Sequence, residues 1–249
     1  KNVDVEYIGF QKVDHRLEDA IKEKIDNNYD GIIVPGFVVG VEKYVNMAKS
    51  KNIAVMAFNC DFAEGVERVA YFGPDIYASG RLAGEAIANA LNDEGQIAII
   101  RGPLETSINR VRRDAIYEVI NKKKKMKMAA EIEAETDNSK VYKNTMEALN
   151  KFHNLSGIVI LTGGITGAAR AVQEKGLAGK VKIVCFDYDN EVIELIKKGV
   201  IYAAIGQDPF SQGHDPIIAM YNYLVTGEKP ASVSYTRTEY IDIRSVSED

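Results

Sequence analysis

The sequence predicts an α/β protein of two lobes, each built on a doubly wound parallel sheet. Short apolar segments alternate with helical segments along the whole chain, which indicates βαβ units with right-handed crossovers. The apolar segments are nearly continuous rather than alternating, as expected for strands that are covered on both faces. Roughly ten strands are too many for one sheet in 249 residues, so we expect two sheets.

The first half of the chain contains four expected strands and three expected helices. Residues 3–10 are predicted to be a strand, and residues 13–28 a helix in which Leu17, Ile21 and Ile25 form one apolar stripe. The next strands are expected at 30–36 (DGIIVPG), 53–59 (IAVMAFN) and 68–73 (RVAYFG), and the helices at 38–52 and 78–92.

The second half repeats the same alternation. Strands are expected at 96–102, 126–135, 157–162, 181–189 and 201–207, with a final strand at 235–244. Helices are expected at 107–123, 141–152, 167–175, 190–198 and 212–225. Ala83, Gly84 and Ala88 in the alanine-rich helix at 78–92 are small enough to permit close packing.

The two lobes are expected to be joined by short crossings, because no linker rich in Pro, Gly or Ser separates them. Residues 1–74 and 208–233 are predicted to form the amino-terminal lobe, and residues 75–207 and 234–249 the carboxy-terminal lobe. A cleft between lobes is the natural ligand site. No strand–helix unit precedes residues 3–10, so the usual central strand of the first lobe is missing and strand edges would stay unpaired. We therefore expect an upstream segment or a partner chain to complete this lobe.

Composition excludes several classes of function. The chain has 46% apolar and 27% charged residues and a net charge of −5, which gives no electrostatic case for nucleic acid as a partner. No apolar run reaches membrane-spanning length. Cys60 and Cys185 both follow apolar strand segments, which favours buried thiols over a disulfide. The three histidines have no metal-ligand spacing, and no phosphate-loop or dinucleotide motif is present, so no metal and no cofactor are expected.

Phe186 and Asp187 stand at the carboxyl end of the strand expected at 181–189, where open α/β sheets bind their ligands. An aromatic ring can cover a C–H face of a polyhydroxylated ligand while a carboxylate accepts its hydroxyl protons. The structural alternative is a core Phe and an Asp that caps the following helix.

Other strand ends carry polar groups that would complete such a site. Asn59 and Asp61 come from the first lobe, and Arg112, Thr162 and Gln207 from the second. The guanidinium of Arg112 offers a rigid set of donors that can hold two neighbouring hydroxyls, while the carboxylates and amides supply acceptors.

Each of these residues also has a purely structural interpretation. Asn59 and Asp61 could shape a turn, and Arg112 could be a solvated helix charge. Gln207 could be a hinge residue, and Thr162 could cap the glycine loop that follows it. These alternatives remain open from the sequence alone.

His214 beside Asp215 resembles a catalytic pair, but no serine or cysteine nucleophile motif accompanies it, which favours a role at a helix start. The pair Gly163-Gly164 is interpreted as a tight strand-to-helix turn.

Several segments together resemble one known family, the type I periplasmic sugar-binding proteins of the ribose and xylose group, whose fold is shared with the effector domains of lactose-repressor-type regulators. The segments are DGIIVPG, IAVMAFNCD, RVAYFGPDIYASGRLAGE, the helix from Ser107 through Arg112, IVCFDYDNE and AAIGQDPFSQG. The resemblance implies that the sugar contacts are Asn59 (with Asp61 two positions on), Arg112, Phe186, Asp187, Gln207 and, loosely, Thr162.

The chain departs from the family pattern in two ways. Many members have aspartate where this chain has Asn59, and the family's first strand and helix, which bring further ligand contacts, are absent. The pocket implied by the resemblance is therefore incomplete.

The resemblance implies a non-catalytic, extracytoplasmic sugar-binding protein. It would close on a pentose or hexose such as xylose or ribose, and present the sugar to a membrane transporter or signal its presence to a sensor histidine kinase. The alternative is the effector-binding domain of a lactose-repressor-type transcription regulator, which would be cytoplasmic. A third class, a sugar-modifying hydrolase, would need paired carboxylates at hydrolytic separation.

Overall fold

The protein consists of two compact units. The computed structural model describes residues 3–9, 15–38, 40–134 and 136–247. The first unit comprises residues 1–74 and 208–237, and the second comprises residues 75–207 and 238–249. The chain passes from one unit to the other three times, so neither unit is a continuous stretch of sequence.

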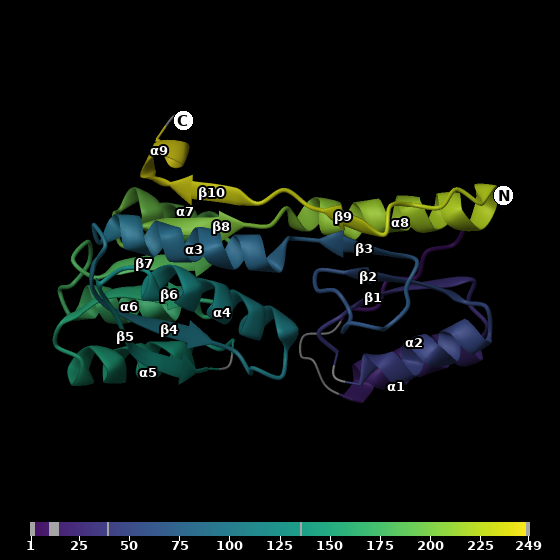
Figure 1. Cartoon of the computed structure of the whole chain (residues 1–249), viewed down its shortest axis with the longest axis horizontal. Coiled ribbons are helices and arrows are strands. Elements are labelled where there is room, and N and C mark those ends of the chain that lie inside the picture. The colour runs from purple at the N-terminus through teal and green to yellow at the C-terminus, as the bar shows by residue number, and fades with distance from the viewer. Residues whose placement is uncertain (1–2, 10–14, 39, 135, 248–249) are drawn as a thin grey trace. The chain divides into compact units, whose positions relative to one another are not determined.

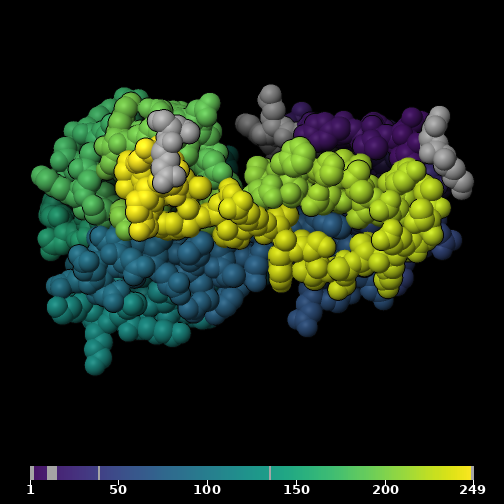
Figure 2. Space-filling model, turned by 90° about the horizontal axis from the view of Figure 1, so that it is seen from above, coloured from purple at the N-terminus to yellow at the C-terminus, as the bar shows by residue number. Residues whose placement is uncertain are grey.

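The first unit has a parallel sheet of order β1-β2-β3-β9 with helices on both faces (Figure 1). Its strands are β1 (Gly31–Pro35), β2 (Ala54–Phe58), β3 (Ala70–Gly73) and β9 (Val233–Tyr235). Its helices are α1 (His15–Asp26), α2 (Val41–Ser50) and α8 (Pro209–Thr226). Figure 2 shows α8 and the tail up to β9 on the visible face of this unit.

Two cores hold the first unit together. Helices α1 and α2 pack on one face of the sheet through a cluster that includes Ile25, Val45 and Val55. On the other face, Met56 and Phe72 pack against Met220 of α8. Both central strands are nearly continuously buried, as expected for strands covered on two sides.

The start of the first unit differs from the sequence-based expectation. Residues 3–9 form no strand, and Phe10 lies outside the described residues. Val3, Val5 and Tyr7 alternate as in a strand but are 46%, 60% and 90% exposed. A strand needs a neighbour to satisfy its backbone groups, and among the described strands β1 stands at the end of the sheet and pairs only with β2.

The second unit has a six-stranded sheet of order β10-β8-β7-β6-β4-β5. Its strands are β4 (Glu94–Arg101), β5 (Lys125–Glu133), β6 (Leu155–Ile160), β7 (Lys182–Phe186), β8 (Ala203–Gly206) and β10 (Glu239–Asp242). Its helices are α3 (Ile76–Ala90), α4 (Ser107–Asn121), α5 (Asn138–Lys151), α6 (Ile165–Glu174), α7 (Asn190–Lys197) and α9 (Ile243–Val246). All neighbouring strands are parallel except β10, which runs antiparallel to β8.

Helices cover both faces of this sheet. One core cluster packs α5, α6 and α7 on the sheet, and a second packs α3 and α4 on the opposite face. Helices α3 and α4 approach closely because α3 has glycines where they meet. A Cβ on Gly80 would lie 2.8 Å from the Cα of Arg112, and a Cβ on Gly84 would lie 3.0 Å from the Cβ of Val119. The predicted close packing of this alanine-rich helix is therefore confirmed.

The carboxy-terminal tail corrects a second expectation. The strand predicted at 235–244 is found in part: β10 lies within this range, but β9 reaches only its first residue and belongs to the other unit, because the chain crosses between the units after Arg237. Strand β9 pairs with β3 of the first unit, whereas β10 pairs with β8 of the second. The crossing that we expected after residue 233 falls after Arg237.

The predicted fold class is confirmed: the chain is an α/β protein with two parallel-sheet units. Cys60 and Cys185 are free and buried, as predicted. Within the described part of the chain, no helix combines the length and the apolar character that a membrane span requires.

Candidate functional site

Three side chains of the second unit, one from helix α4 and two from strand ends, are linked in a row. Arg112 donates from Nη2 to Oε1 of Gln207, and Gln207 donates from Nε2 to Oδ1 of Asp187 at 2.6 Å. Gln207 follows β8 directly and Asp187 follows β7 directly, and these two strands are neighbours in the sheet. The row therefore lies at the carboxyl edge of the sheet, where ligands of open α/β folds bind.

Arg112 is a buried residue in the second turn of α4. It is 3% exposed, which excludes the solvated helix charge that the sequence left open. Its guanidinium carbon lies 3.9 Å from the centroid of the Phe186 ring, at cation–π distance. A buried cation needs such partners, because desolvation without them is costly.

Asp187 has an unusual backbone that turns its carboxylate toward Gln207. Its φ of 64° lies in the left-handed region, and its N–H donates to the carbonyl of Ile205 at 2.9 Å. The N-cap of α7 is Asp189, which accepts from the N–H of Val192 at 2.9 Å. Asp187 is thus not the helix cap that was its structural alternative, and it is exposed.

Phe186 is only 3% exposed. It lies in the core cluster of α3 and α4, and one face of its ring carries the Arg112 guanidinium. Phe186 therefore supports Arg112 by packing its ring against the guanidinium.

Gln207 has features of both interpretations that the sequence left open, a member of the polar site and a hinge residue. It is 4% exposed and bridges Arg112 to Asp187, and it is also the last residue of its unit before the chain crosses at Asp208. Thr162 lies in the turn between β6 and α6 and is half-buried. Gly164, with φ of 81°, is the N-cap of α6, so Thr162 is not the cap.

In the first unit, Asn59 follows β2 and is held at three points. Its φ is 61°, its N–H donates to the carbonyl of Phe72 at 3.0 Å, and its carbonyl accepts from the Tyr71 hydroxyl at 3.2 Å. Its side-chain Nδ2 donates to Oε1 of Gln212 at 3.0 Å. Left-handed residues fixed this strongly by their surroundings gather at functional sites.

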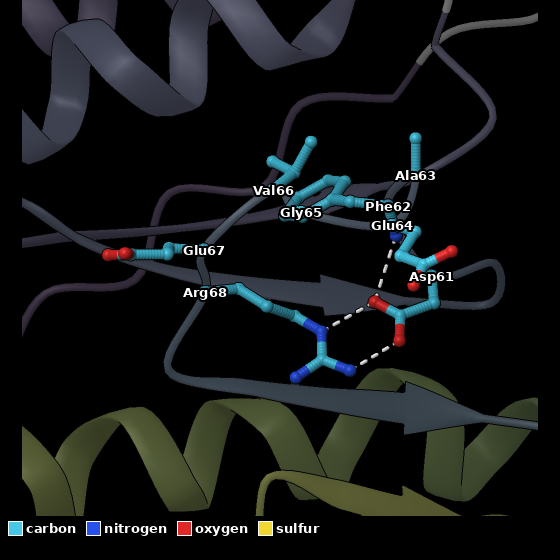
Figure 3. A pocket seen from close by; sticks show the side chains of 8 residues that line it. All are labelled: Asp61, Phe62, Ala63, Glu64, Gly65, Val66, Glu67 and Arg68. Atoms are coloured by element: carbon cyan, nitrogen blue, oxygen red, sulfur yellow. Dashed lines mark hydrogen bonds and ion pairs between the residues drawn. The ribbon is translucent and has the colours of Figure 1, made fainter.

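Asp61 is paired with Arg68 within its own loop. Arg68 binds both carboxylate oxygens of Asp61, and Oδ1 also accepts from the N–H of Phe62 at 2.8 Å (Figure 3). The loop from Asp61 to Arg68 lines an open hollow of about 280 Å³. The bonds to Arg68 and Phe62 give Asp61 the turn-shaping role that the sequence left open.

Gln212 is a buried polar residue that sequence reasoning missed. It is 5% exposed and lies in the first turns of α8. The helix begins at Pro209, three residues before the expected start, with Asp208 as N-cap. The Asp-Pro pair was the available signal for that start. The bond from Asn59 to Gln212 joins residues 153 positions apart, and no sequence signal indicated it.

His214 and Asp215 lie inside α8 rather than at its start. Their side chains contact each other at 2.9 Å, and both are about half exposed. His214 also stacks on the ring of Phe210 at 5.3 Å between centroids. The pair is a surface contact of the helix.

A cluster of charged residues fixes α4 to the sheet. Arg101 at the end of β4 donates to Glu131 at 2.5 Å and to Glu133 at 2.6 Å on β5. From α4, Tyr117 donates to Glu131 at 3.1 Å, and Arg113 lies 3.6 Å from it. Burial opposes ionisation of Glu131, but the hydrogen bonds from Arg101 and Tyr117 outweigh it and lower its pKa. The cluster thus anchors α4 at Arg113, the residue that directly follows Arg112.

The row in the second unit has groups that suit the hydroxyls of a neutral polyol. It offers a buried cation, an amide and an exposed carboxylate, and hydrogen bonds to charged groups are the strong ones. Within residues 3–9, 15–38, 40–134 and 136–247, no group of three or more His, Cys, Asp or Glu residues is arranged to hold a metal ion.

Comparison with known proteins identifies the family. The model of the periplasmic binding protein domain matches residues 2–229. The chain belongs to this family. Among curated relatives, the ribose import binding protein RbsB of Haemophilus influenzae is 28% identical over 80% of this chain and 66% of its own length. The xylitol-binding protein of Mycolicibacterium smegmatis is 30% identical over 68% of this chain and 48% of its own length. These two relatives are named as a ribose-binding and a xylitol-binding protein.

Solved structures of periplasmic binding proteins share the fold. GanP, a glucose-galactose binding protein from Geobacillus stearothermophilus, is 26% identical with a TM-score of 0.92, covering 98% of this chain and 88% of GanP. A chain of the XylFII-LytSN complex is 22% identical with a TM-score of 0.84, covering 92% of this chain and 82% of that one. The alignments with the curated relatives span 40% to 66% of their own length.

Proposed function

We propose that this periplasmic binding protein binds a pentose or hexose, such as xylose or ribose, through its strand-end residues. Arg112, Asp187 and Gln207 of the second unit would contact the sugar hydroxyls, and Asn59 of the first unit would contact the same sugar. Phe186 would support Arg112. Asp61 and Thr162 are proposed as peripheral contacts, because Asp61 is paired with Arg68 and Thr162 lies one strand away.

The observation that carries this proposal is the row from Arg112 through Gln207 to Asp187. Gln207 accepts from Arg112 and donates to Asp187, so each group is held in a defined orientation before a ligand arrives. Preorganised donors and acceptors lose little conformational entropy on binding. A hydroxyl is both donor and acceptor, and the guanidinium and carboxylate at the two ends of the row match these two properties.

The sugar would be carried rather than converted. The family consists of binding proteins, and we propose no catalytic step and no cofactor for this chain. Sugar binding would favour a closed form over an open one only through contacts that differ between the two. The protein would act outside the cytoplasm and deliver the sugar, or the signal of its presence, to a membrane transporter or a sensor histidine kinase. The solved complex of XylFII with LytSN supports a protein partner of the second kind.

Isothermal titration calorimetry with a panel of pentoses and hexoses tests the proposal. We expect one or a few sugars to bind with a dissociation constant in the micromolar range or below, and the bound sugar to be recovered unchanged. Absence of binding across the panel, or conversion of a sugar to a product, would refute it. A thermal-shift screen with the same panel is the quick first measurement, because a ligand that binds only the folded state raises the unfolding midpoint.

A further inference from the structure

We infer that Gln212 is a positioning residue for Asn59, and that this amide pair allows an uncharged residue to occupy the strand-end position of the first unit. The inference rests on the proposed function, because it assigns a partner to one of the proposed sugar contacts. Its basis is the side-chain hydrogen bond between Asn59 Nδ2 and Gln212 Oε1 at 3.0 Å.

The backbone of Asn59 is already fixed without Gln212. Its N–H and carbonyl are bonded to Phe72 and Tyr71 of the neighbouring strand, and its φ is 61°. Only the side-chain torsions remain to be set. The bond to Gln212 sets them, because it directs Nδ2 toward α8 and therefore directs Oδ1 the opposite way.

Gln212 is itself held firmly enough to act as an anchor. It is 5% exposed, and its N–H donates to the carbonyl of Asp208 at 3.2 Å in the first turn of α8. Asp208 caps the same helix by accepting from the N–H of Ser211 at 3.1 Å. The helix start is thus rigid, and a buried amide on it holds its partner in one orientation.

An amide at this position differs from a carboxylate in carrying no charge. While Nδ2 of Asn59 donates to Gln212, Oδ1 of Asn59 is directed away from α8, where it can accept a hydrogen bond from a hydroxyl. The pair also avoids placing a charge beside the half-buried strand end, where desolvation would be costly. Asn59 held by Gln212 therefore presents a neutral hydrogen-bonding group in a fixed orientation.

Substitutions at both positions test this arrangement. Q212L removes the acceptor while keeping side-chain size, and we expect it to raise the dissociation constant of the bound sugar about tenfold. Q212E keeps an acceptor for Nδ2 and should restore most of that loss. N59D with Q212E places two carboxylates about 3 Å apart, and should weaken binding by more than the product of the two single effects. Asn222→Leu, two to three turns later on α8, is the matched control and should bind as the wild type does.

A second measurement needs no sugar. In the ligand-free protein, the thermal midpoint of N59D/Q212E should fall by more than the sum of the two single shifts, because like charges repel only when both are present. Additive shifts would show that the pair does not form, and would overturn the inference.

The two measurements separate the possible failures. Suppose that the thermal midpoint of N59D/Q212E falls by more than the sum of the single shifts, but Q212L binds sugar as tightly as the wild type. The bond would then be a structural contact only, and the positioning role would be overturned. If the wild-type protein binds no sugar of the panel, the proposed function fails, and the role of Gln212 toward a sugar fails with it. If R112A weakens binding but Q212L and Q212E are alike, the proposed function stands and the inference alone is wrong.

Discussion

Replacing Arg112 by alanine is the most informative perturbation of the candidate site. The substitution removes the charged donor to Gln207, a bond of about 1.5–3 kcal/mol, and the contact over the Phe186 ring, about 1 kcal/mol. Gln207 then loses the partner that orients its amide toward Asp187. The sugar would lose its direct contact with Arg112, and Gln207 and Asp187 would no longer be held in one orientation.

We expect sugar binding to weaken by about 2–4 kcal/mol, which is about 30- to 700-fold in the dissociation constant. Calorimetry of the folded variant measures this directly, with circular dichroism to check that α4 is intact. Arg112→Lys should recover only part of the loss, because a lysine keeps the charge but not the planar set of donors.

Arg110 provides the matched control, since it is an exposed arginine on the same helix that donates to the carbonyl of Leu104. R110A should leave the affinity within about twofold of the wild type. Equal affinities of the wild type and R112A would refute the reasoning, because the buried cation at one end of the row could not then be a ligand contact.

Three further predictions follow from the second unit. Gly80→Val should press α4 away from α3, lower stability by about 1–3 kcal/mol and weaken sugar binding through Arg112, and an unchanged melting curve would contradict this. Because the folded-state pKa of Glu131 is lowered, its stabilising contribution is present above about pH 4 and is lost as the pH falls through the lowered value. E131Q should therefore flatten the acid side of the stability profile, and an equally steep profile would argue against it. Burial raises the pKa of the Cys185 thiol, so mass spectrometry should show alkylation at pH 8 only after unfolding, and rapid native labelling would count against a closed core.

Most of the fold could be predicted because its signals are local. The apolar runs of β2, β7 and β8 are nearly continuous, and strands of that kind occur in sheets covered on both faces. The strand predicted at 3–10 does not form over residues 3–9, because alternating apolar residues do not by themselves supply a pairing partner. The final strand was predicted in part: β10 lies within 235–244, but the predicted start was too early, because no sequence pattern in residues 236–238 marks the crossing between the units.

The candidate site could be predicted in part for a similar reason. Arg112, Asp187 and Gln207 each follow or face a strand end, and the order of the strands brings such ends to one edge. Their mutual bonds needed the structure. The pairing of Asp61 with Arg68 and of Asn59 with Gln212 depends on loop and helix positions that no sequence period encodes.

The last two strands have a consequence for how this protein is made. Among the described strands, β9 forms an outer edge of one sheet and β10 an outer edge of the other, and both follow the remaining strands in the sequence. During synthesis, the edges of β3 and β8 therefore stay unpaired until residues 233–242 have been made. A stop codon shortly before Val233 would thus remove one strand from each sheet. We expect such a product to be captured by chaperones or to precipitate, even though every residue that we propose to contact sugar has been made.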